Sequence, residues 1–197
     1  NVIVAGADTI SQFILSGFQS FHAVSNQPCK PFDAQRNGIT LGEAAATIIL
    51  SSQKPLGKQV IELGGGAVSN DANHISGPSR TGEELYLVMK ESMTEAGVTA
   101  EDIDFISAHG TATMYNDEME AKAINLAGLQ QVPVNSLKAN YGHTLGAAGL
   151  LEAVTCVLSL KENVVLPTLG FETFGTTKPV NVLKQLQQGE YKTCLKT

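Results

Sequence analysis

Two short segments of the sequence carry the side chains best suited to chemistry. The first, His109-Gly110-Thr111-Ala112-Thr113, directly follows a predicted strand at residues 103–108. Ligands of open α/β sheets bind outside the carboxyl ends of the strands, so a histidine at this place can face a substrate. The glycine lets a substrate approach the backbone, and the two threonines offer hydroxyl groups. A structural interpretation stays open, in which hydrogen bonds satisfy His109 and the threonines close a turn.

The second segment runs from Lys138 to Gly149 and contains His143. It leads into the apolar stretch 144–160, in which Glu152 is the only charged residue. A buried carboxylate needs a partner, and Lys138, just before this stretch, is the candidate. The sequence therefore predicts an ion pair between Lys138 and Glu152. The pair is either purely structural or also sets the electrostatic field around His143.

Other chemistries find less support in the sequence. The triplet Gly64-Gly65-Gly66 is not followed by the Lys-Ser/Thr of a phosphate-binding loop, so nucleotide binding is not expected. Cys29, Cys156 and Cys194 are odd in number and widely spaced, which gives no zinc motif and favours a reducing, cytoplasmic compartment. Cys156 lies in the apolar stretch and is expected in the core. Cys29 lies in a turn, where nothing activates a thiol.

The hydrophobic pattern predicts strands alternating with helices, which favours an α/β fold with largely parallel strands. The clearest helix starts near Thr81, a capping residue with Glu84 three positions on, and ends at Gly97. Ile48-Ile49-Leu50 is typical of a strand buried on both faces. Strands or extended segments are predicted at 1–5, 39–50, 60–68, 103–108 and 132–136, and helices at 10–21, 81–97, 117–127 and 144–160.

The composition excludes several classes of protein. Charged residues make up 16% of the chain against about 25% in typical domains, and 43% of residues are hydrophobic, which indicates a folded domain. The net charge of −6, without a basic cluster, argues against nucleic acid and anionic membrane surfaces as partners. The apolar stretch 144–160 is shorter than the ~20 residues that span a bilayer, so it is expected to be a buried helix.

Taken together, four segments resemble the β-ketoacyl synthases, the condensing enzymes of fatty acid and polyketide synthesis. They are Cys29-Lys30-Pro31-Phe32-Asp33 with Gly42-Glu43-Ala44-Ala45, the loop Asp71-Ala72-Asn73-His74, the His109 segment and the Lys138 segment. The resemblance implies an α/β fold, the thiolase-like αβαβα sandwich, of which this chain is largely the C-terminal half. Residues 1–70 would then end the N-terminal half, and residues 71–197 would form the C-terminal half without its final strand.

By this resemblance the protein is a β-ketoacyl-[acyl-carrier-protein] synthase, which performs the decarboxylative Claisen condensation of an acyl thioester with a malonyl thioester. The implied site residues are catalytic His109, His143 and Lys138, substrate-binding Thr111 and Thr113, and supporting Glu152. No metal and no diffusible cofactor is implied, because an acyl carrier protein supplies the phosphopantetheine arm. The implied partners are that carrier protein and a second subunit, in a homodimer or in a heterodimer with a ketosynthase-like chain, in the cytoplasm.

Two alternatives to an active synthase remain. In family order the nucleophilic cysteine would lie shortly before Asn1, so this polypeptide by itself is expected to be inactive. Some members are non-catalytic partners of the chain-length-factor type, which lack that cysteine and usually lose the histidines as well. The presence of His109, His143 and Lys138 favours the active enzyme. A second alternative is a piece that serves only carrier-protein docking or dimerisation.

Overall fold

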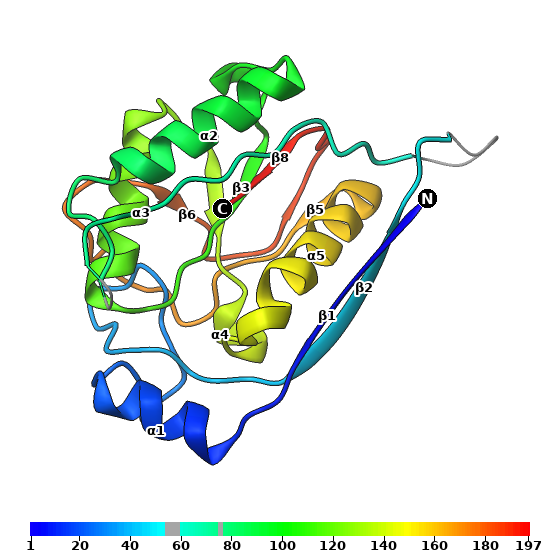
Figure 1. Cartoon of the computed structure of the whole chain (residues 1–197). Coiled ribbons are helices and arrows are strands. Elements are labelled where there is room, and N and C mark those ends of the chain that lie inside the picture. The colour runs from blue at the N-terminus through cyan, green and yellow to red at the C-terminus, as the bar shows by residue number, and fades with distance from the viewer. Residues whose placement is uncertain (54–59, 75–76) are drawn as a thin grey trace.

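The computed structural model describes residues 1–53, 60–74 and 77–197. At its centre lies a parallel sheet in the strand order β6-β4-β3-β8 (Figure 1). Every residue of β3 is buried, as expected for a parallel strand that is covered on both faces. The strands of this sheet are β3 (Phe105–Ser107), β4 (Pro133–Asn135), β6 (Asn181–Val182) and β8 (Cys194–Lys196).

Helices cover both faces of the sheet (Figure 1). On one face, Met89 of α2 and Ile124 of α3 pack in one hydrophobic cluster with Ile106 of β3. On the other face, Phe105 of β3 packs with Cys156 of α5. The helices are α2 (Glu83–Ala96), η1 (Ala100–Asp102), α3 (Met114–Leu126), α4 (Lys138–Tyr141), η2 (Leu145–Ala147) and α5 (Ala148–Glu162).

A two-stranded antiparallel ribbon lies against the side of α5 that faces away from the sheet (Figure 1). The ribbon consists of β1 (Val2–Asp8) and β2 (Ala44–Leu50). Between these strands the chain forms α1 (Gln12–Ser20), which has no buried residue. A short antiparallel pair, β5 (Val164–Val165) and β7 (Gln187–Gln188), completes the described strands. The layers are therefore α2 and α3, the sheet, α5, and the ribbon.

The predicted α/β class is confirmed, and each helix expected from the sequence overlaps an observed helix. The helix at 144–160 begins later than expected, because η2 precedes α5. Cys156 lies in the core, as predicted. No helix in the three described ranges combines the length and the apolar character needed to cross a bilayer.

Some local predictions were wrong. Ile49 is 68% exposed, so β2 is not buried on both faces: within the described part of the chain β1 is its only neighbouring strand, and α5 covers one side. Residues 60–68 form no strand. The cap of α2 is Gly82 rather than Thr81, whose hydroxyl accepts only the backbone N–H of Glu83. Helix α3 starts at Met114, before the predicted start at 117.

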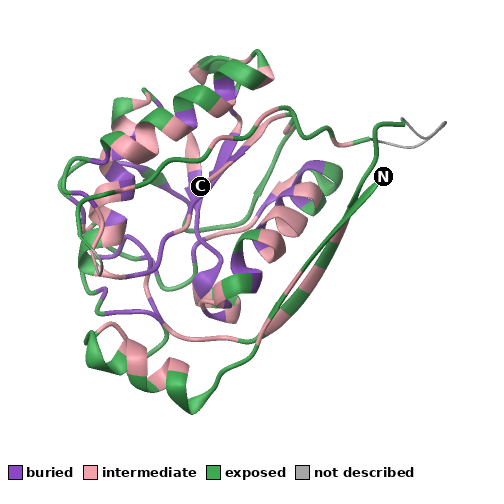
Figure 2. Ribbon diagram, viewed as in Figure 1, coloured by how far each residue is buried: buried purple, intermediate pink, exposed green. Residues whose placement is uncertain are grey.

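Burial is uneven across the molecule. Figure 2 shows the buried residues gathered in the central sheet, on the helix sides that face it and in the loops at its lower edge. The ribbon and α1 contain only exposed and partly exposed residues. The candidate site residues lie in the buried part.

Candidate active site

His109 stands two residues after β3, at the carboxyl end of the parallel sheet, as the sequence predicts. Its ring atom Nδ1 lies 3.2 Å from Nζ of Lys138 in α4. An ammonium group can only donate hydrogen bonds, so Nδ1 accepts and the proton of the neutral ring is on Nε2. Lys138 therefore fixes the tautomer of His109.

His143 lies between α4 and η2 and has the same tautomer for a different reason. Its Nδ1 accepts the backbone N–H of Leu145 at 3.0 Å, which again leaves the ring proton on Nε2. The two rings meet edge to face, with centroids 5.1 Å apart. Both imidazoles are partly exposed, so a ligand can reach them. The structure thus brings together two histidines whose free nitrogens are donors.

The backbone of His143 is held by the chain segment that precedes β2. The N–H of His143 donates to the carbonyl of Thr40 at 2.7 Å, and the N–H of Gly42 donates to the carbonyl of His143 at 3.0 Å. A side chain at Gly42 would place its Cβ 2.0 Å from the carbonyl oxygen of Tyr141. Only glycine therefore lets this segment approach closely enough to hold His143.

The predicted ion pair between Lys138 and Glu152 is present. Nζ of Lys138 lies 2.6 Å from Oε1 of Glu152, and each side chain is only 1% exposed. Burial lowers the pKa of Lys138, and the carboxylate of Glu152 opposes this effect. The other oxygen of Glu152, Oε2, lies 2.8 Å from Nζ of Lys196 in β8. Two lysines thus share one buried carboxylate.

Both histidines are neutral at pH 7. Burial, followed by the nearby charge of Lys138, lowers the pKa of His143 to about 4. Burial also holds the pKa of His109 well below its ordinary value, and the ammonium groups of Lys138 and Lys196 add to this effect. Neutral rings with the proton on Nε2 can donate hydrogen bonds without carrying charge.

Two buried carboxylates of α3, which were not among the residues predicted for the site, hold the loop that carries His109. Glu120 accepts the backbone N–H of His109 at 2.7 Å and that of Gly110 at 2.8 Å. Asp117, one turn earlier, accepts the N–H of Ala112 at 3.0 Å and that of Phe32 at 2.6 Å. Burial raises the pKa of Asp117 to about 7. Their spacing of three residues, one turn of helix, is a signal that could have identified them as a pair.

Thr111 and Thr113 lie on the same loop, and their hydroxyl oxygens are 2.9 Å apart. Thr111 is 4% exposed, whereas Thr113 is partly exposed and also accepts a hydrogen bond from Asn116. The two hydroxyls point to each other, so Thr113 is the one that a ligand can contact directly.

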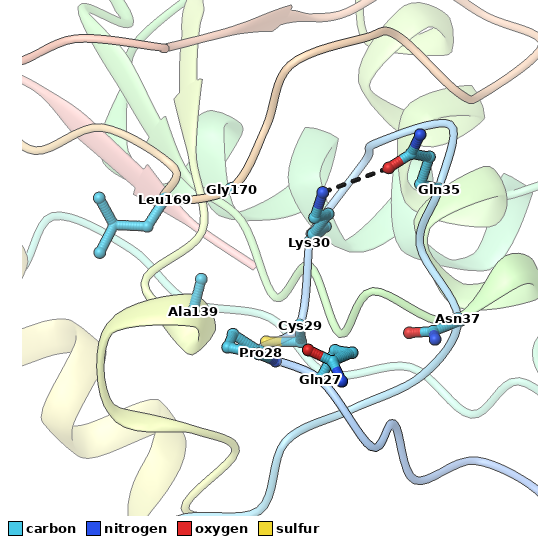
Figure 3. A pocket seen from close by; sticks show the side chains of 9 residues that line it. All are labelled: Gln27, Pro28, Cys29, Lys30, Gln35, Asn37, Ala139, Leu169 and Gly170. Atoms are coloured by element: carbon cyan, nitrogen blue, oxygen red, sulfur yellow. Dashed lines mark hydrogen bonds between the residues drawn. The ribbon is translucent and has the colours of Figure 1, made fainter.

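A cavity of about 470 Å³ lies beside this group of residues, and none of the predicted site residues lines it. Figure 3 shows Lys30 in its wall, hydrogen-bonded to Gln35, with Ala139 of α4 on the opposite side. Cys29 also lines the cavity, but burial raises the pKa of its thiol, which opposes a role as nucleophile. Among the described residues, no group of three or more metal-ligating side chains is poised for a metal ion.

The arrangement can stabilise negative charge that develops on an oxygen. Two neutral N–H donors, held by fixed partners next to a buried ammonium group, have the properties of an oxyanion hole. Such donors are worth several kcal/mol each in a transition state because they need no reorganisation. The site is therefore suited to a reaction that passes through an enolate or a tetrahedral oxyanion.

Comparison with known proteins agrees with this chemistry. Residues 60–172 match the family model "Beta-ketoacyl synthase, C-terminal domain", and residues 1–55 match "Beta-ketoacyl synthase, N-terminal domain". The chain is 37% identical over 188 residues to 3-oxoacyl-[acyl-carrier-protein] synthase 2 of Rhizobium meliloti, covering 87% of this chain and 44% of the relative. It spans about half the length of the curated relatives it matches.

Solved structures of ketosynthases have the same fold. A ketosynthase (ApeO) in complex with its chain length factor (ApeC) from Xenorhabdus doucetiae matches 96% of this chain and 47% of its own, with 36% identity and a TM-score of 0.87. The complex AntDE:AntF, a type II polyketide synthase acyl-carrier protein with its ketosynthase, matches 98% of this chain and 52% of its own, with 26% identity and a TM-score of 0.88. The predicted thiolase-like α/β fold is confirmed, and the chain belongs to the β-ketoacyl synthase family.

Proposed function

We propose that this chain is the C-terminal part of a β-ketoacyl-[acyl-carrier-protein] synthase. The reaction is the decarboxylative Claisen condensation of an acyl thioester with a malonyl thioester, in fatty acid or polyketide synthesis. One observation carries the proposal: His109 and His143 form a pair of neutral imidazoles, and each has its proton on Nε2. The cysteine that takes up the acyl group would lie in a preceding part of the protein.

The histidine pair acts on the malonyl group in this proposal. The carbon–carbon bond between the malonyl methylene group and the carboxylate breaks, and carbon dioxide leaves. The electron pair of this bond forms an enolate, whose negative charge rests on the thioester oxygen. The two Nε2–H groups donate hydrogen bonds to that oxygen and lower the barrier to decarboxylation. The enolate carbon then attacks the acyl thioester and forms the new carbon–carbon bond, and the cysteine thiolate leaves.

The remaining site residues support these donors. Lys138 donates to Nδ1 of His109, which keeps the proton on Nε2, and Glu152 offsets the buried charge of Lys138. Thr113, with Thr111 behind it, would bind the phosphopantetheine arm that the carrier protein brings to the site. The proposal requires no diffusible cofactor and no metal.

The proposed partners are an acyl carrier protein and a second ketosynthase-like subunit. The matched structures include a ketosynthase with its chain length factor and a ketosynthase with its acyl-carrier protein. The second subunit is either a copy of this protein or a related chain, and we propose a cytoplasmic location for the assembly.

The test is malonyl decarboxylation by the full-length protein, measured as carbon dioxide released from malonyl-carrier thioester. His109→Ala and His143→Ala are each expected to abolish it while sparing acyl transfer to the cysteine. His22→Ala replaces an exposed histidine of the same chain and is expected to keep the wild-type rate. Wild-type decarboxylation in both site variants would overturn the assignment.

The intact mass of the full-length protein separates the active enzyme from a silent partner. After incubation with an acyl-carrier thioester, an active synthase gains one acyl mass, and prior thiol blocking prevents the gain. A protein that gains no acyl mass would be the non-catalytic partner, and the proposal of an active synthase would fail.

A further inference from the structure

Lys196 lies at the end of β8, and the proposed function gives it no role. β8 pairs in parallel with β3, and Lys196 stands opposite Ser107, two residues before His109. This register brings the lysine to the same edge of the sheet as the histidine pair. Its side chain is 22% exposed, whereas those of Lys138 and Glu152 are 1% exposed.

The carboxylate of Glu152 has one oxygen for each lysine. Oε1 accepts a hydrogen bond from Lys138 at 2.6 Å, and Oε2 faces the ammonium group of Lys196 at 2.8 Å. Among the described residues, Oε2 has no other polar partner. Without Lys196, half of a buried carboxylate would be unpaired, and it would compete with His109 for the hydrogens of Lys138.

We propose that Lys196 is a positioning residue for the condensation reaction, an inference that rests on the proposed function. By holding Oε2 of Glu152, Lys196 keeps the carboxylate from turning and leaves Lys138 free to donate to Nδ1 of His109. His109 thereby keeps its proton on Nε2, where the enolate oxygen needs it. The chain of contacts runs from Lys196 through Glu152 and Lys138 to His109.

Lys196 also acts on His109 through its charge. The charged or titratable groups around His109 are Lys138 of α4, Lys196 of β8, His143, Glu120 of α3 and Glu152 of α5. The two lysines oppose protonation of the ring, and the two carboxylates favour it. Removing one lysine therefore makes imidazolium easier to form, and His109 then loses its neutral state at a higher pH than in the wild type.

The first experiment compares pH profiles of malonyl decarboxylation by the full-length protein. Lys196→Met is expected to move the midpoint of the acid limb upward by about one pH unit, which is about a tenfold loss of rate below that midpoint. Lys196→Arg keeps the charge and is expected to restore the wild-type profile. Lys192→Met removes an exposed lysine of the same segment and is expected to change nothing.

Three results would overturn the proposal: an unchanged profile in Lys196→Met, an equal displacement in Lys192→Met, or a uniform loss of rate at every pH. If Lys196→Met is too unstable to purify, Lys196→Gln keeps a hydrogen-bond donor for Glu152. It is expected to displace the acid limb in the same direction.

A second readout does not depend on turnover. Ring ¹⁵N chemical shifts of His109 in the full-length protein report directly which nitrogen carries the proton, with His109→Gln to assign the signals. The wild type is expected to show Nε2–H, and Lys196→Met is expected to gain Nδ1–H or imidazolium. If the wild type does not decarboxylate malonyl thioester, the proposed function is wrong. The spectrum still shows whether Lys196 determines which nitrogen of His109 carries the proton. An unaltered spectrum in Lys196→Met would refute it.

Discussion

The central sheet and the β1–β2 ribbon both contain large apolar side chains, but they lie in opposite environments. Ile106 of β3 is fully buried, whereas Ile49 of β2 is 68% exposed. β3 has a strand on each side and helices on both faces, while β2 has β1 beside it and α5 on one face. The number of neighbouring elements, rather than the strand's own residues, decides how much of it is buried.

The same contrast extends to polar groups. Around His109, buried carboxylates and ammonium groups have partners at hydrogen-bond distance, as for Glu120, Lys138 and Glu152. On the ribbon side, α1 buries no residue at all. The candidate site thus lies where burial strengthens each polar contact and where the loss of a hydrogen-bond partner destabilises the protein most.

The largest effect is expected from Glu152→Ala, which leaves Lys138 buried without its counter-charge. Breaking a buried pair in this way costs about 3–5 kcal/mol of the free energy of unfolding. Urea denaturation of the chain measures the loss. Glu162→Ala, at the exposed end of the same helix, is expected to change stability by less than about 0.5 kcal/mol. Similar losses in both variants would contradict the importance of the buried pair.

A matched pair of substitutions tests the contrast between sheet and ribbon directly. Ile106→Ala is expected to cost about 2–5 kcal/mol in the 197-residue chain, because the cavity forms in a packed core. Ile49→Ala is expected to cost about 0.5 kcal/mol or less. Urea denaturation compares the two variants. A loss of about 2 kcal/mol for Ile49→Ala in the full-length protein would break the comparison, since it would mean that the ribbon is covered there.

Acidification is expected to lower the free energy of unfolding through His143, which lies in the candidate site. The pKa of His143 is about 4 in the folded chain and 6.5 ordinarily. Between pH 4 and pH 6.5 the unfolded state therefore binds more protons than the folded state. The stability that the neutral ring contributes is lost as the pH falls through this range. His143→Gln cannot take up this proton. The stability advantage of the wild type over this variant should therefore decrease from pH 6.5 to pH 4.

Thermal or urea unfolding at several pH values measures this difference between the two proteins. Asp117, whose raised pKa of about 7 has the opposite effect on the slope, contributes to both proteins and cancels. A difference that stays constant with pH would contradict the lowered pKa of His143.

A small stabilising effect is expected on the ribbon side. Gly17 lies inside α1, and a Cβ added there would meet no atom within 4 Å. Gly17→Ala is therefore expected to raise stability by about 0.5–1 kcal/mol through helix propensity alone. A destabilised variant in the full-length protein would mean that another surface packs closely on α1.

The sequence was sufficient to locate α1, α2, α3 and α5, whereas η1, α4 and η2 are only three or four residues long, too short for a periodic pattern to reveal them. It was insufficient for β2: Ile48-Ile49-Leu50 is typical of a buried strand, but burial depends on neighbours that a local pattern does not contain. Thr81 failed as a cap because Gly82 takes the cap position in the left-handed conformation.

The candidate site was predicted in the same uneven way. His109, His143 and Lys138 stand next to predicted strand and helix ends, but it was the resemblance to the β-ketoacyl synthases that implied one shared site. Glu120 was missed because a carboxylate early in a helix is explained by the helix dipole alone. Lys196 was missed because its contact with Glu152 depends on the pairing of β8 with β3, which the sequence does not reveal.

The contact between Thr40 and His143 limits how related synthases can be recombined. Thr40 and Gly42 lie in the part of the chain that matches the N-terminal family domain, and His143 lies in the part that matches the C-terminal one. A chimera that joins the two parts from different relatives at residues 55–60 therefore takes Thr40 and Gly42 from one parent and His143 from the other. The two backbone hydrogen bonds between them must then form across the junction. The hybrid keeps His143 in place only if the parent that supplies the N-terminal part has no side chain at the position of Gly42.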